Sequence, residues 1–232
     1  MNKINKSISK FFLSLILILL LAHTVVADRS TQNAGTQAGQ GTEFICVPLM
    51  DGCSDNGLAP SEQVFFDNFE SGRPNPDWDL GDGWYVTNFD GRNYVIRGSS
   101  FKWAVLKNHE VNNFIFSARF QRNQGALHFC FRVNTPPDGL HRYFVSVDDQ
   151  MLVLTKQFGQ NSFNDLAKTN LNLNPGWHTI AIEAKGGNIR VLIDSKNCIC
   201  FEDGSPILTG GISLETIQNS DFVVDDVYIG RL

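Results

Sequence analysis

The chain has 232 residues, of which 42% are hydrophobic and 19% are charged, with 20 Gly and 8 Pro. This composition excludes a collagen-like, a wholly disordered or a polytopic membrane protein, and it fits one globular domain of under about 200 residues with additional segments. The chain contains 18 Phe against 4 Trp and 4 Tyr, and many of the Phe lie in short alternating runs. Such runs favour β-structure.

The first 27 residues have the pattern of a secretory signal peptide. Three Lys precede an apolar run from Phe11 to Ala22, and Val25 and Ala27 are the small residues before Asp28. This run is shorter than the roughly 20 apolar residues that span a bilayer, so we expect cleavage rather than an uncleaved anchor. The sequence predicts a secreted protein, periplasmic or extracellular, with no membrane insertion after cleavage.

The cleaved chain is acidic. It would keep 16 Lys and Arg against 24 Asp and Glu, a formal charge of −8, because the signal segment removes three Lys and no acid. Nucleic acids and anionic membranes are bound through dense positive patches. We therefore expect no nucleic-acid partner, whereas this charge is compatible with a neutral glycan.

Residues 28–62 are predicted to form a flexible tail. Residues 28–41 are rich in Thr, Gln, Gly, Ala and Asn and lack aromatic residues, so they cannot bury enough apolar surface to fold. Cys46 and Cys53 flank a segment whose Pro and Asp-Gly favour a turn. A small disulfide loop between these two cysteines is one pairing that the spacing allows.

The cysteines of an exported chain are expected to form disulfides. There are five of them, so at least one thiol stays free or pairs between molecules. Cys198 and Cys200 lie two residues apart in a β-like run. They cannot bond each other, because a disulfide needs Cβ atoms about 4 Å apart.

From residue 63 to residue 232 the pattern changes to short apolar runs separated by Gly, Asn, Asp and Pro, without a helical period. The runs predict strands at Val64–Glu70, Trp84–Asn88, Tyr94–Arg97, Trp103–Lys107, Phe114–Gln121, Ala126–Val133, Tyr143–Asp148, Met151–Lys156, His178–Lys185, Ile189–Asp194, Ile199–Glu202, Gly211–Glu215 and Phe222–Ile229. Strands of this number, joined by tight turns, predict an all-β domain in which two antiparallel sheets pack as a jelly-roll sandwich.

Alternation within these strands predicts which side chains form the core. Every second residue is apolar in five of the strands. The rows predicted to face the core are Phe114, Phe116, Ala118 and Phe120; Leu127, Phe129, Phe131 and Val133; Tyr143, Val145 and Val147; Ile180, Ile182 and Ala184; and Ile189, Val191 and Ile193. Trp103 and Trp177 begin strands and are predicted to pack in the core, whereas Trp78 lies in a polar turn and is predicted to be exposed.

The order of several segments is also informative. The chain runs through QVFFDNFESG (63–72), WHTIAIEAKGGNIRVLIDS (177–195), GGISLE (210–215) and FVVDDVYIG (222–230). In this order the segments resemble the concanavalin A-like lectin/glucanase superfamily, above all its laminin-G-like jelly rolls and the 3-keto-disaccharide hydrolase domain. The resemblance covers residues 64–232 and implies a concanavalin A-like fold. It does not select a function, because the superfamily includes lectins, hydrolases and adhesion modules.

The sequence lacks several well-known catalytic patterns. A retaining glucanase of this superfamily would carry a Glu-x-Asp-x-Glu strand that places two carboxylates about 5 Å apart. The chain has seven Glu, and no two are closer than eight residues. It also lacks Gly-x-Ser-x-Gly, His-Glu-x-x-His and P-loop motifs. We therefore assign no catalytic residue.

Acidic residues of the first and last strands are candidate calcium ligands. The resemblance implies that a structural Ca²⁺ can lie where these two strands run side by side, held by hard oxygen ligands. Asp67, Glu70 and Asp226 are the candidates, and Asp225 is expected to point to the opposite face from Asp226. The alternative is that these carboxylates cap a solvated sheet edge.

The reverse face of three predicted strands carries the candidate ligand-binding residues. Arg119, His128, Arg132, Arg142 and Phe144 all lie opposite the predicted core rows. Simple hairpin registers would place His128 beside Arg119, and Arg132 beside Arg142. In the resembled fold one sheet is concave and holds carbohydrate, so we expect these residues to line a groove for a glycan, and the Arg side chains would suit an acidic one. The alternative is an outer sheet face whose Arg side chains pair with acids from loops.

The sequence therefore predicts an exported, non-catalytic jelly-roll module that binds a carbohydrate or another cell-surface ligand. A glycoside or keto-disaccharide hydrolase is the first alternative, by resemblance alone. A structural or adhesion module of the cell envelope is the second.

Overall fold

The computed structural model describes residues 58–91, 93–99 and 101–232. The predicted signal segment, the tail as far as residue 57 and the expected Cys46–Cys53 loop lie outside these residues. No helix long and apolar enough to cross a membrane occurs in the described residues.

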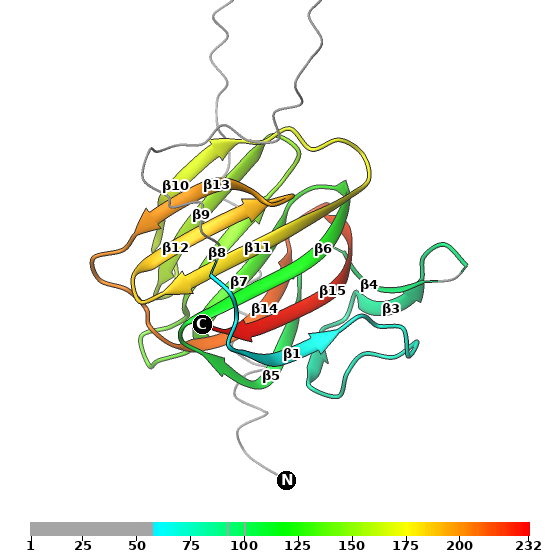
Figure 1. Ribbon diagram of the computed structural model, residues 1–232, viewed down its shortest axis with the longest axis horizontal. Coiled ribbons are helices and arrows are strands. Elements are labelled where there is room, and N and C mark those ends of the chain that lie inside the picture. Colours follow the sequence, from blue (N-terminus) through cyan, green and yellow to red (C-terminus); the bar gives the residue numbers. More distant parts are fainter. Residues whose placement is uncertain (1–57, 92, 100) are drawn as a thin grey trace, which may run out of the picture. The chain divides into compact units, whose positions relative to one another are not determined.

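The described chain forms two antiparallel sheets (Figure 1). The strands are β1 (Glu62–Asp67), β2 (Trp78–Leu80), β3 (Trp84–Asn88), β4 (Tyr94–Ser99), β5 (Lys102–Val111), β6 (Phe114–Gln124), β7 (Leu127–Asn134), β8 (His141–Val147), β9 (Met151–Phe158), β10 (Phe163–Asn170), β11 (Trp177–Lys185), β12 (Asn188–Ile193), β13 (Lys196–Glu202), β14 (Gly210–Thr216) and β15 (Asp221–Arg231). The eight-stranded sheet has the order β13-β12-β11-β6-β15-β4-β3, with β1 also paired to β15, and the seven-stranded sheet has the order β10-β9-β8-β7-β14-β5-β2. Figure 1 shows the eight-stranded sheet in front of the other.

All thirteen predicted strands are present, and the all-β, two-sheet prediction is confirmed. The sequence pattern missed β2 and β10. β2 has only three residues, which is too short for an alternating pattern. β10 is an edge strand whose register shifts between Asp165 and Ala167, so polar residues and a bulge interrupt its alternation.

The core lies between the sheets and is built on the predicted Phe rows. Phe114, Phe116 and Phe120 of β6 are at most 1% exposed. Phe114 meets Phe131 of β7 edge to face with ring centroids 5.8 Å apart, and Phe116 and Phe120 meet Phe129 at 5.9 and 5.7 Å. Each such contact adds about 0.5–1.5 kcal/mol to the burial of the rings. β6 and β7 therefore face each other across the core and belong to different sheets.

A buried arginine braces one end of the sandwich. Arg132 follows the β7 core row, has a φ of +50° and is 0% exposed. Its guanidinium donates to the carbonyl oxygens of Asn112 (3.2 and 2.7 Å), Gly186 (2.8 Å) and Ile207 (2.7 Å). Burial lowers the pKa of Arg132. One side chain thus ties together the β5–β6 turn, the β11–β12 turn and the segment before β14.

The cysteines divide into two kinds. Cys198 and Cys200 of β13 each take part in a disulfide, and Cys130 of β7 is a buried free thiol. The expectation that an odd count leaves a free thiol is confirmed at Cys130. Burial raises the pKa of this thiol to about 12, so it stays protonated at neutral pH and is a weak nucleophile.

Replacing the bracing arginine should destabilise the domain strongly. Arg132→Met keeps a long side chain but leaves three backbone carbonyl groups without the four hydrogen bonds that the buried guanidinium donates, which we expect to lower the free energy of unfolding by about 3 kcal/mol. Urea unfolding measures the change. Arg231→Met is the matched control, because Arg231 pairs with Glu62 at a site where both side chains are more than half exposed, and it should cost less than about 1 kcal/mol. Equal losses in the two variants would contradict the bracing role.

Candidate functional site

The outer face of the seven-stranded sheet carries a dense group of polar and aromatic side chains. The strand registers place them in adjacent rows across β5, β14, β7, β8, β9 and β10. The side chains on this face include Trp103, Ser213, Glu215, His128, Cys130, Arg142, Phe144, Ser146, Thr155, Gln157 and Phe163. We call this surface the Arg142 face.

Arg142 lies in the middle of this group of side chains and is 3% exposed. Its Nε donates to Oε1 of Gln157 (2.7 Å), and its Nη1 donates to Oε2 of Glu215 (2.8 Å) and lies 3.1 Å from Sγ of Cys130. The guanidinium also lies between two rings, 4.5 Å from the centroid of Trp103 and 4.7 Å from that of Phe144. Rings and hydrogen bonds together fix the position of this cation.

Glu215 supplies the negative charge that balances Arg142. Burial acts to raise the pKa of Glu215, but the charge of Arg142 and the hydrogen bond from His128 outweigh it and lower the pKa to about 2. The Nδ1 atom of His128 lies 3.0 Å from Oε2 of the same carboxylate. Because an ionised carboxylate only accepts hydrogen bonds, Nδ1 carries the proton and Nε2 is directed away from Glu215.

An aromatic series leads from this charge network to the sheet edge. The His128 ring stacks on Phe144 with centroids 4.4 Å apart and planes 20° apart. Phe144 meets Phe163 of β10 edge to face at 6.4 Å. Phe144, which we expected to line the groove, is only 7% exposed, whereas Phe163 is 46% exposed. Phe163 is therefore the solvent-accessible ring of this series.

Three of the five predicted ligand residues come together here. His128, Arg142 and Phe144 lie on the Arg142 face, and the register places His128 opposite Ser146. Arg132 does not lie beside Arg142: the register shifts between Phe131 and Asn134, and this bulge turns Arg132 into the sandwich end.

Arg119 also lies elsewhere. It is on β6, in the eight-stranded sheet, opposite Thr179 and Asp225. The expectation that it neighbours His128 is wrong, because the β6–β7 connection crosses between the sheets. Its guanidinium lies 4.7 Å over the ring of Trp177.

The predicted calcium ligands Asp67 and Glu70 accept hydrogen bonds from groups of the protein. Asp67 accepts hydrogen bonds from the backbone N–H groups of Phe69 and Asn75 (both 2.9 Å) and from the indole N–H of Trp78 (3.1 Å). Trp78 is 5% exposed, so its predicted exposure is wrong. Glu70 accepts from the backbone N–H of Tyr94. No group of three or more His, Cys, Asp or Glu suited to a metal ion occurs among the residues that the structure describes.

Asp225 and Asp226 do not alternate simply across the sheet. The register of β15 against β6 shifts between Asp225 and Tyr228, and Asp226 has a φ of +47°. This bulge allows both carboxylates to approach Nη1 of Arg119, at 3.7 and 3.3 Å. Burial, together with the charge of Asp226, raises the pKa of Asp225 to about 6.

Several residues of the Arg142 face were not predicted, although the sequence carries a signal for two of them. Ile212 and Leu214 are core residues, so the phase of β14 places Glu215 on the outer face. Ala104 and Leu106 are also core residues, so the phase of β5 places Trp103 on the outer face. Its predicted core position is therefore wrong. Phe163 lies on β10, which the pattern missed.

Comparison with known proteins identifies the fold. No protein-family model and no curated protein matches the chain. Among solved structures, the chain is similar to carbohydrate binding module CBM66 from Bacillus subtilis, with 16% identity, a TM-score of 0.54 and coverage of 66% of this chain and 95% of that one. It is also similar to domain 4 of AbnA, a GH43 extracellular arabinanase from Geobacillus stearothermophilus, solved in complex with arabinotriose (10% identity, TM-score 0.55, coverage 75% and 94%).

A third similar structure is a prokaryotic β-1,3-1,4-glucanase, or lichenase, derived from a mouse hindgut metagenome. It has 15% identity, a TM-score of 0.55 and coverage of 72% of this chain and 99% of that one. These neighbours are binding domains and a hydrolase of one architecture, at identities that establish the fold alone. The described domain is a concanavalin A-like jelly-roll sandwich.

Proposed function

We propose that this protein is an exported, non-catalytic carbohydrate-binding module whose ligand lies on the Arg142 face. The observation that carries the proposal is the placement of Arg142, a buried cation fixed between two rings and one carboxylate. Positioned polar groups beside aromatic rings are the combination that reads hydroxyl groups and stacks on a sugar ring. The similarity to a carbohydrate-binding module and to an arabinanase domain holding arabinotriose supports this choice of ligand.

Several polar atoms of the Arg142 face are available to form hydrogen bonds with a ligand. Within the described part of the chain, Nη2 of Arg142 and Nε2 of His128 make no hydrogen bond. Nη2 presents two N–H donors, and Nε2 presents an acceptor while the ring is neutral. Ser146, opposite His128 in the register, adds a hydroxyl. The exposed Phe163 ring at the sheet edge supplies the apolar surface for stacking.

The electrostatics favour binding over glycoside hydrolysis. A glycosidase needs a protonated carboxylic acid and an ionised carboxylate on either side of one bond. Glu215, with a pKa of about 2, is ionised at neutral pH and cannot donate a proton. Asp225 has a raised pKa of about 6, but it lies on the other sheet, and packed sheets are about 10 Å apart. The two carboxyl groups therefore cannot act on one substrate.

Binding can be tested with arabinotriose, mixed-linkage β-1,3-1,4-glucan and β-1,3-glucan by isothermal titration calorimetry. We expect the protein purified without its first 27 residues to bind at least one of them, and Phe163→Ala to weaken that binding about tenfold through loss of ring stacking. Phe66→Ala is the matched control, because Phe66 is 43% exposed and lies on β1, away from this face. Absence of binding to all three would refute the proposal, and release of shorter sugars would favour the hydrolase alternative.

The lowered pKa of Glu215 predicts a specific pH dependence of stability. The pKa of Glu215 is lowered from 4.5 to about 2 on folding, so its contribution is present above pH 4.5 and is lost as pH falls towards 2. A shift of this size corresponds to roughly 3 kcal/mol. Urea unfolding between pH 6 and pH 2.5 should show this loss in the natural protein and a much smaller one in Glu215→Gln. Glu110→Gln, at an exposed position, should retain the natural profile; an unchanged profile in Glu215→Gln would contradict the assignment.

A further inference from the structure

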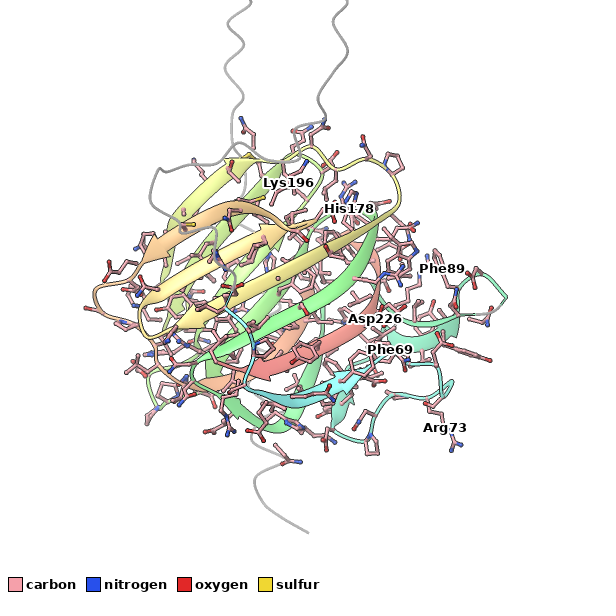
Figure 2. The ribbon with its side chains drawn as sticks, in the orientation of Figure 1. Phe69, Arg73, Phe89, His178, Lys196 and Asp226 are labelled. Atoms are coloured by element: carbon pink, nitrogen blue, oxygen red, sulfur yellow. The ribbon has the colours of Figure 1, made fainter. Side chains whose placement is uncertain are left out.

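A second cluster of aromatic and charged side chains lies on the outer face of the eight-stranded sheet. It brings together Phe89 from the β3–β4 hairpin, Arg119 from β6, Trp177 from the start of β11, and Asp225 and Asp226 from β15. We call these five residues the Trp177 cluster. Figure 2 labels Phe89 and Asp226, both on the right of the view. The cluster is separated from the Arg142 face by the whole thickness of the sandwich.

The aromatic part of the cluster is partly open to solvent. Phe89 meets Trp177 edge to face, with centroids 5.4 Å apart and planes 72° apart. Phe89 is 39% exposed, and the Arg119 side chain, which covers Trp177, is 42% exposed. An exposed ring held against a second ring offers an apolar surface that a ligand can bury.

The turn that carries Phe89 is held by its own hydrogen bonds. The backbone N–H of Phe89 donates to the carbonyl of Asn93 (2.9 Å), the N–H of Gly91 donates to Oδ1 of Asn88 (2.6 Å), and the N–H of Asn93 donates to Oδ1 of Asp90 (2.8 Å). The backbone N–H groups of Phe89, Gly91 and Asn93 are therefore all hydrogen-bonded. Pre-organisation of this kind lowers the entropic cost of binding.

The polar part of the cluster has hydrogen-bonding capacity left over. Arg119 uses Nη1 to reach Asp226 (3.3 Å) and Asp225 (3.7 Å). Its Nε and Nη2, and Oδ1 of Asp226, make no hydrogen bond to any residue in the described ranges. Donors and an acceptor therefore stand side by side next to the exposed ring of Phe89.

The charges of the cluster restrict the class of ligand. Two carboxylates face one guanidinium, so an anionic ligand would be repelled. A cationic ligand would compete with Arg119, which already lies over Trp177 and pairs with both carboxylates. A neutral molecule with an apolar face and several hydroxyl groups fits both the rings and the free donors and acceptor.

We propose that the Trp177 cluster is a second binding site, for a neutral saccharide, on the sheet opposite the Arg142 face. Because the two sites lie on opposite outer faces, two short saccharides can be bound at once. A polysaccharide chain bound at one face leaves the other face available to a second chain, so the domain can cross-link a polymer.

Calorimetric stoichiometry tests the second site. With arabinotriose and with oligosaccharides of mixed-linkage β-1,3-1,4-glucan as probes, we expect two sites in the natural protein and one in Phe89→Ala. Asp226→Asn should also weaken the second site by fivefold or more, and Asn tolerates the positive φ of this position. Phe66→Ala, which removes a similarly exposed ring on β1, should keep both sites. A single site that Phe89→Ala leaves unchanged would overturn this inference.

The same variants separate the two proposals. Loss of one site in Phe163→Ala and of the other in Phe89→Ala supports both. Binding that depends on Phe89 but not on Phe163 would refute the Arg142 face and retain the Trp177 cluster, and the reverse result would do the opposite. Absence of binding to either probe would refute both. Turbidity of soluble mixed-linkage glucan is the second readout: the natural protein should precipitate the polymer, and each single-site variant should not.

Discussion

The packing of Phe rows between the two sheets is the constraint on which the rest of this structure depends. Phe114, Phe116 and Phe120 of β6 interlock with Phe129 and Phe131 of β7. Because side chains alternate along a strand, fixing these rings in the core also fixes which residues point outward. His128 and Cys130 are thereby committed to one outer face of the sandwich and Arg119 to the other. Both candidate binding surfaces follow from the same core.

Two buried arginines illustrate how context assigns different roles to one residue type. Arg132 donates only to backbone carbonyls and holds together two turns and the segment before β14. Arg142 is balanced by Glu215 and enclosed by rings on an outer face. Desolvation makes a buried charge costly unless partners surround it, and both sites meet this requirement. The Arg142 arrangement retains donors for a ligand, whereas the carbonyl oxygens around Arg132 occupy its guanidinium at the sandwich end.

Much of the fold and part of the candidate site were predictable from local pattern. Alternation located thirteen strands and the core rows, because burial on one face of a strand leaves a period of two in the sequence. The same phase placed His128, Arg142 and Phe144 on an outer face, and the phases of β5 and β14 could have added Trp103 and Glu215. The pattern failed at β2 and β10, where shortness or a bulge interrupts the period, and at Arg132 and Asp226, where bulges change the direction of a side chain.

The sequence by itself determined that residues 63–232 are all-β, and it placed most residues of the core rows and the side chains that alternate with them. Those properties depend on neighbours along the chain. Only the tertiary structure decided which strands share a sheet, because strand pairing depends on contacts between distant segments. It separated Arg119 from His128 by sending β6 and β7 to different sheets, and it joined Arg119 to Trp177 and Phe89. One predicted binding face thus became two opposite surfaces, since a hairpin in sequence can cross the core instead of lying flat in one sheet.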